Sequence, residues 1–147
     1  MGGKGKLRHW PRVACVMVLL VAGSAGPLHA AAALAVGVTD SPADGIAYGW
    51  AINFQTPEEA RKVALEKCRA FENAPKAVKA CKLIGAAEKH CLALAFDPKN
   101  DSPGMGWAIE SSREAAQRRA LERCRAAAPA DRRAFCEIDL IKCDGEP

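Results

Sequence analysis

The apolar residues of this chain follow two kinds of pattern, and these patterns occur twice in the same order. Short apolar runs at 34–38 and 92–96 predict strands, and each run is followed by an Asp and a Pro that favour a turn. Helical spacing comes later, because Ala60, Ala64 and Cys68 recur every fourth residue and would share one helix face. Each copy therefore predicts strand, loop, strand, helix, connector and strand.

The two predicted helices carry start signals. Thr56 can cap the first helix, because a proline follows it directly and a glutamate lies three residues on. In the second copy, Ser111 or Ser112 can take this role, and the helix then carries Ala116, Ala120 and Cys124 on one face. An alanine face favours close packing against a sheet, with the charged residues on the solvated faces.

Comparison of the chain with itself shows an internal repeat. The matched blocks are Leu34–Val38 with Leu92–Phe96 at offset 58, Gly49–Ile52 with Gly106–Ile109 at 57, Ala64–Ala70 with Ala120–Ala126 at 56, and Cys81 with Cys136 at 55. We expect an α+β fold of two tandem β-β-α-β repeats, about 34–91 and 92–143. The strands would form a mainly antiparallel sheet with the two helices packed on it and three disulfides.

The N-terminus has the three parts of an export signal. Met1–Arg12 is basic, Val13–Ala22 is apolar, and small residues follow as far as Ala32. An uncleaved membrane anchor is the alternative, but the apolar run of about ten residues is shorter than the roughly 20 that span a bilayer. We predict a signal peptide over 1–32, cleaved after Ala32 or a few residues to either side, and one domain over 33–147 without a membrane span.

The charge of the chain lies mainly in this leader. The formal net charge is +4, but Lys4, Lys6, Arg8 and Arg12 all precede the apolar run. Without them, 17 of the 21 basic residues remain, and they equal the 17 acidic residues. A neutral chain lacks the positive electrostatic field that attracts nucleic acids. With few aromatic residues it also lacks a surface on which bases stack, so we expect no nucleic-acid partner.

The chain has seven cysteines, of which Cys15 lies in the leader. An even number of cysteines in a short exported chain predicts disulfides. A metal site is the alternative, but there is no close Cys-x-x-Cys pair, and His90 is the only histidine after the leader.

The six remaining cysteines allow 15 pairings. The repeat favours Cys68–Cys81 and Cys124–Cys136, each tying a helix end to the next strand. Cys91 and Cys143 then remain as the third pair, and we expect that pair to link the two units.

The sequence resembles a known family. The repeated Gly-Trp-Ala-Ile block, the Ala-Leu-Glu-Lys/Arg-Cys-Arg-Ala helix end and the six paired cysteines resemble the bacterial "domain of unknown function 4189" family. The likeness covers about Leu34 to Cys143. It implies export and a compact cystine-bearing domain, and it assigns no catalytic residue.

Few residues suggest catalysis. A hydrolase needs a nucleophile and an oriented base, and His90 is the one candidate imidazole, beside a cysteine assigned to a disulfide. A small envelope-directed hydrolase could instead use the carboxylates of Asp97, Asp101 and Glu110. We favour a structural role for His90 and expect no catalytic residue.

Each loop after a first strand carries two aspartates. Asp40 and Asp44 lie in one loop, and Asp97 and Asp101 in the other. Carboxylates in a loop suit calcium, but aspartate is also a common turn former and no third carboxylate follows at the expected spacing. We therefore expect no metal and no cofactor.

Trp50 and Trp107 occupy matched positions inside apolar blocks. Large aromatic side chains dominate burial in small domains, so a core position is favoured for both. Stacking on a ligand such as a sugar is the alternative, and an exposed member of the pair would be the best binding-site candidate.

These observations predict a non-enzymatic, exported binding module that acts in the periplasm or outside the cell. The reasons are the stapled scaffold, the neutral mature chain and the lack of a recognisable catalytic set. We expect the partner to be a protein or an envelope component, contacted through loops on the rigid repeats. A small envelope-directed hydrolase and a calcium-stabilised structural module are the alternatives.

Overall fold

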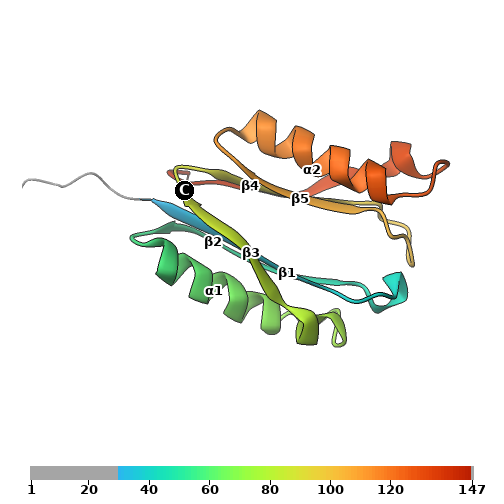
Figure 1. The fold of residues 1–147 in the computed structure, drawn as a ribbon, viewed down its shortest axis with the longest axis horizontal. Coiled ribbons are helices and arrows are strands. Elements are labelled where there is room, and N and C mark those ends of the chain that lie inside the picture. Colours follow the sequence, from blue (N-terminus) through green and yellow to red (C-terminus); the bar gives the residue numbers. More distant parts are fainter. Residues whose placement is uncertain (1–29, 147) are drawn as a thin grey trace, which may run out of the picture.

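The computed structural model describes residues 30–146, so only the last three residues of the predicted signal peptide lie within it (Figure 1). The elements, with η for a short 3₁₀ helix, are β1 (Ala31–Val38), η1 (Pro42–Asp44), β2 (Ile46–Phe54), α1 (Pro57–Arg69), η2 (Ala77–Ala80), β3 (Lys82–Glu88), β4 (Cys91–Phe96), β5 (Met105–Glu110), α2 (Arg113–Ala127), η3 (Arg133–Phe135) and β6 (Glu137–Cys143). The predicted order of strand, strand, helix and strand occurs twice.

The six strands form two three-stranded antiparallel sheets, in the orders β2-β1-β3 and β5-β4-β6. In each sheet the first strand of the unit is central, and the helix carries the chain across it from one edge to the other. The predicted α+β fold of two β-β-α-β repeats is confirmed. The strands are divided between two sheets, however, where the sequence predicts one.

The two sheets pack face to face, and α1 and α2 cover their outer faces (Figure 1). Apolar clusters fill the space under each helix and the space between the sheets. β1 and β4 are buried along almost their whole length. Strands that are apolar on both faces need a cover on each side, which is why the units face each other and do not extend one open sheet.

Each helix begins at a side-chain cap. The Oγ1 atom of Thr56 accepts the backbone N–H of Glu59 at 3.2 Å, and the Oγ atom of Ser112 accepts that of Ala115 at 3.2 Å. The sequence leaves Ser111 and Ser112 as alternatives for the second cap. The structure selects Ser112, which is the residue that the repeat pairs with Thr56.

A glycine in each second strand lets the helix approach the sheet closely. A Cβ atom on Gly49 would collide with the backbone of Ala64 and Cys68 in α1. Gly106 lies in the same relation to α2. The glycine of the repeated Gly-Trp-Ala-Ile block is therefore required by helix packing, since any side chain would push the helix off the sheet.

The strand register corrects one part of the repeat alignment. Leu34 lies opposite Trp50, and Leu94 lies opposite Trp107. Leu34 therefore corresponds to Leu94, not to Leu92 as the apolar runs suggest. A slip of two residues keeps every side chain on the same face of a strand, so the apolar pattern does not distinguish the two alignments.

The structure contains the disulfides Cys68–Cys81, Cys124–Cys136 and Cys91–Cys143, which are the pairs that the repeat favours. The prediction that Cys91–Cys143 links the two units is wrong, because these residues lie opposite each other on β4 and β6 of one sheet. Ala31 and Glu88 occupy the corresponding positions in the first sheet. Within residues 30–146, no disulfide joins the two sheets.

The contact between the sheets is apolar in the centre and polar along one edge. Leu34, Val36 and Leu92 are fully buried between the sheets. Along the edge formed by β2 and β6, the hydroxyl of Tyr48 donates a hydrogen bond to Asp139 Oδ2 at 2.8 Å. This bond connects residues 91 positions apart, so it reports directly on the docking of one unit against the other.

We expect Gly49→Ala to lower the free energy of unfolding by about 1–3 kcal/mol, because the new methyl group overpacks the contact with α1. Gly106→Ala should do the same beneath α2. Gly85→Ala is the matched control, since its methyl group would meet only the Cδ1 atom of Ile109, at 3.1 Å. Urea unfolding followed by circular dichroism measures all three, and an equal loss in the control would contradict this role of the two glycines.

The docking of the units should also be visible in the titration of Tyr48, the only tyrosine in the chain. Burial and the hydrogen bond to Asp139 raise the pKa of Tyr48 from 10.0 to about 12. The unfolded chain ionises first, so stability present below pH 10 should be lost as the pH rises from about 10 to 12. The ultraviolet absorbance of tyrosinate follows the ionisation of this one residue, and Asp139→Asn should move the pKa back towards 10.0.

Candidate functional site

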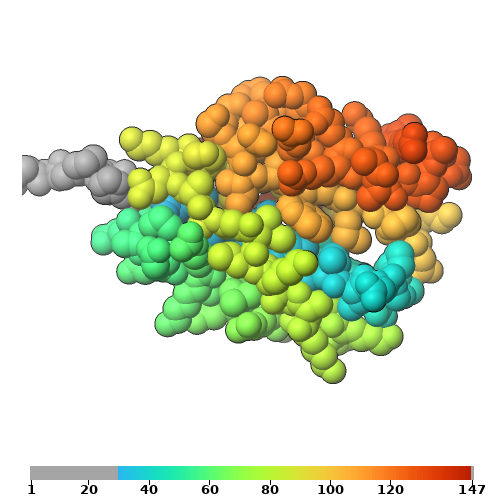
Figure 2. All heavy atoms as spheres, in the orientation of Figure 1, coloured from blue at the N-terminus to red at the C-terminus, as the bar shows by residue number. Residues whose placement is uncertain are grey.

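The two loops with the predicted aspartate pairs lie at the same end of the molecule. Residues 39–45 connect β1 to β2, and residues 97–104 connect β4 to β5. Figure 2 shows a hollow between the cyan first loop and the yellow-orange second loop. This inter-loop cleft has a volume of about 490 Å³ and is lined by residues 42–46, Asn73, 96–102, Gly104 and Met105.

The first loop is held by Asp44. Its carboxylate accepts hydrogen bonds from the hydroxyl of Thr39 and from the ammonium of Lys76, both at 2.8 Å. Lys76 lies in the connector between α1 and β3, so the bond ties the loop to this connector of its own unit. The hydrogen bonds from Lys76 and Thr39 hold the pKa of Asp44 below its ordinary value.

The second loop is held in the same way by Asp97, whose side chain is 0% exposed. The guanidinium of Arg132 donates two hydrogen bonds to it, at 2.5 and 3.0 Å, and the hydroxyl of Ser102 donates a third at 2.7 Å. The backbone N–H of Lys99 donates a fourth, at 3.2 Å. The bonds from Arg132, with those from Ser102 and Lys99, outweigh burial and hold the pKa of Asp97 well below its usual range.

Both loops therefore use a hydroxyl and a carboxylate five residues apart, in opposite order along the chain. In each case a basic residue from the connector after the helix completes the ion pair. The aspartates could be predicted from the local sequence but these partners could not, because Asp44 and Lys76 are 32 residues apart and Asp97 and Arg132 are 35 apart. The repeat could have suggested them, since each connector carries a basic residue shortly after its proline.

The aspartate pairs do not form a joint metal site in the described part of the chain. Asp44 and Asp97 each have a basic partner, and Asp40 and Asp101 are exposed. Between residues 30 and 146, no group of three or more His, Cys, Asp or Glu side chains could hold a metal ion.

The three carboxylates named for a hydrolase are likewise not brought together. Asp97 directly follows β4, while Glu110 lies opposite Cys91 at the other end of the same hairpin. Asp101 is exposed on the loop with a φ of 64°. An acid and a base must both reach one substrate bond, and this arrangement places Asp97 and Glu110 a full strand length apart.

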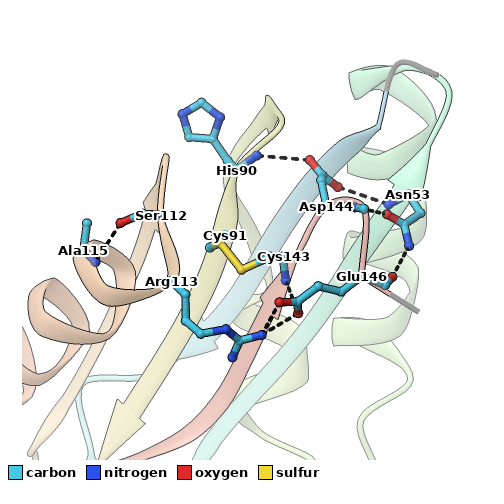
Figure 3. The surroundings of a disulfide bond; sticks show 10 residues. Asn53, His90, Cys91, Ser112, Arg113, Ala115, Cys143, Asp144 and Glu146 are labelled. Atoms are coloured by element: carbon cyan, nitrogen blue, oxygen red, sulfur yellow. Dashed lines mark hydrogen bonds and ion pairs between the residues drawn. A yellow bond between two sulfur atoms is a disulfide. The ribbon is translucent and has the colours of Figure 1, made fainter. Parts of the chain in front are cut away.

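His90 belongs to a structural cluster at the opposite end of the molecule (Figure 3). Its backbone N–H donates to Asp144 at 3.3 Å, and its ring Nδ1 lies 2.5 Å from the carbonyl oxygen of Glu88. The ring points away from the neighbouring disulfide in Figure 3. The carboxylate of Asp144 also accepts the backbone N–H of Asn53 at 3.1 Å, so this cluster connects the two units.

The chain end after β6 completes this cluster. The Glu146 carboxylate accepts hydrogen bonds from Arg113 at the start of α2 and from the backbone N–H of Cys143. The side chain of Asn53 bonds to Gly145 and Glu146. The sequence pattern does not point to Asp144 or Glu146, because two carboxylates after a last strand carry no periodic pattern.

The two tryptophans are both half-buried and differ in what covers them. Trp50 has the ammonium groups of Lys67 and Lys142 over its ring, 4.6 and 5.4 Å from the centroid. Trp107 lines a hollow of about 320 Å³ together with Met105, Gly106 and Arg123. Both pack against the cluster between the sheets, so each contributes to the core and still reaches the surface.

The comparison with protein families agrees with this architecture. The sequence model of the family described as "Domain of unknown function (DUF4189)" matches residues 31–143. The chain belongs to the DUF4189 family. The match covers β1 through β6, so the DUF4189 domain comprises both repeats and all three disulfides. No curated protein and no solved structure matches the chain.

Two observations bear on where this DUF4189 domain acts. Three disulfides are typical of proteins outside the cytoplasm, where the environment is oxidising. No helix within residues 30–146 is long and apolar enough to cross a membrane.

The ion pair of Asp97 predicts how the stability of the folded protein depends on pH in acid. Because the pKa of Asp97 is lowered in the folded state, its contribution is present above the unfolded pKa near 4 and is lost as the pH falls through the lower folded value. Asp97→Asn should lower the melting temperature at pH 7 and flatten its decline below pH 4. Asp101→Asn, on the same loop but exposed, is the matched control in thermal melts and should match wild type.

Proposed function

We propose that this protein is an exported, non-enzymatic binding module whose recognition site is the inter-loop cleft. The observation that carries the proposal is the convergence of one loop from each repeat at one end of the molecule, with both loops anchored by ion pairs. Binding sites are often built from loops that a rigid scaffold holds in place. The partner is a protein or an envelope component.

The lining of the cleft suits recognition. Ile46, Phe96 and Met105 are half-buried apolar residues among its walls, and Asn73 and Asn100 are exposed amides. Apolar contact surface combined with a few polar groups that set orientation is the usual composition of a binding site. Of the three aspartates that line the cleft, Asp44 and Asp97 are already held by Lys76 and Arg132, and only Asp101 is exposed, which favours binding over hydrolysis.

Export is supported by the predicted leader and the disulfides, and it places the protein in the periplasm or the medium. The structure bears on the cleavage position as well. Ala31 and Ala32 lie in β1, are fully buried and pair with β3. A cleavage that keeps the whole of β1 would fall before Ala31. This position is within a few residues of the predicted cleavage after Ala32.

Site-specific photo-crosslinking tests the proposal in the exporting cell. A benzophenone amino acid at Asn100, on the rim of the cleft, should capture a discrete partner. The same amino acid at Glu114, which is exposed in the first turn of α2, is the matched control and should not. Asn73→Ala, on the other wall of the cleft, should reduce the Asn100 adduct severalfold.

Circular dichroism verifies that each labelled protein is folded, so that a missing adduct can be interpreted. The same adducts at both positions, or none at Asn100 in folded protein, would contradict recognition through the cleft.

A further inference from the structure

The two repeats provide an internal comparison for the tryptophans. Lys142 of β6 covers Trp50 and pairs with Leu92 of β4. The residue at the corresponding position of the first sheet is Ala87. The position of the second cation over Trp50 therefore holds only a methyl group in the other half, while Lys67, the first, corresponds to Arg123 of α2. Within the described residues no cation lies over the ring of Trp107.

The hollow beside Trp107 adjoins the inter-loop cleft. Met105 lines both, and from there β5 runs through Gly106 to Trp107. The two depressions measure about 490 and 320 Å³. An elongated ligand in the cleft could therefore continue past Met105 and place its next unit on Trp107.

An extended peptide is a poor candidate for this path. β5 is an edge strand, paired only with β4, and a peptide would bind it by adding a further strand. The guanidinium of Arg123, however, donates a hydrogen bond to the carbonyl oxygen of Trp107 at 2.5 Å. This bond occupies the backbone acceptor that an added strand would need in the middle of β5.

A saccharide fits the side chains along this path. The apolar face of a sugar ring can stack on the half-exposed indole of Trp107, and its hydroxyl groups can bond to the amides of Asn73 and Asn100. The exposed charges of Lys99 and Asp101 are of opposite sign, so the loop does not select an ionic ligand.

We propose that the ligand is a neutral oligosaccharide that runs from the inter-loop cleft along β5 and stacks one sugar ring on Trp107. This inference rests on the proposed binding function and specifies its ligand class.

Intrinsic fluorescence tests this directly. After leader removal the chain contains two tryptophans, Trp50 and Trp107, so a Trp50→Phe variant reports on Trp107 alone. Titration with N-acetylglucosamine trimer, and separately with cellotriose, should give a saturable change in emission with at least one of them. Isothermal calorimetry on the wild-type protein should give the same dissociation constant.

The two tryptophans serve as matched variants. Trp107→Ala removes the aromatic face and should weaken saccharide binding about tenfold, which corresponds to about 1.4 kcal/mol, while Trp50→Phe should leave it unchanged. Trp107→Phe should restore part of the affinity, because an aromatic face remains. This partial rescue would not occur if Trp107→Ala acted only by loosening the core.

The outcomes separate this inference from the broader function. If neither saccharide binds folded protein, or if Trp107→Ala leaves saccharide affinity unchanged, the inference is overturned. A protein adduct at Asn100 together with no saccharide binding would sustain the binding function and replace the glycan by a protein partner. Failure of both experiments would remove the function as well.

Discussion

The rest of this structure depends on the burial of two central strands on both faces. β1 and β4 offer almost no polar side chain to water, so each needs a helix on one side and a second sheet on the other. One repeat supplies only the helix, and the other repeat supplies the second sheet. The pairing of the two units is therefore a consequence of strand composition, and it places the loops of both units at one end, where they can form a joint cleft.

Polar contacts then determine what each end of the molecule can do. At the cleft end, Asp44 and Asp97 each form an ion pair with a basic residue of their own unit. These ion pairs fix the loop conformations and occupy both carboxylates. At the other end, Asp144 and Glu146 connect the last strand to the first unit and to the start of α2. The proposed binding function rests on the loops that these ion pairs hold in place.

The repeats share a framework and differ where they meet solvent. Both keep the glycine beneath the helix, the capping hydroxyl and the disulfide after the helix, because each of these is needed to hold one helix on one sheet. They differ at the Cys91–Cys143 disulfide and at Lys142, which correspond to Ala31, Glu88 and Ala87. The surfaces of the two halves are consequently unequal, and Trp107 borders an open hollow while Trp50 lies under two lysine side chains.

The sequence by itself determined the order of strands and helices, the capping Thr56 and the cysteine pairs within each repeat, because these depend on residues close together in the chain. Only the tertiary structure decided the two-sheet arrangement, the two-residue shift between β1 and β4, and the place of Cys91–Cys143 in one sheet. It also decided that loops some 57 residues apart form one cleft. The apolar pattern of a strand records which faces are buried but not what covers them, so the partner of each face follows only from the packing of the whole chain.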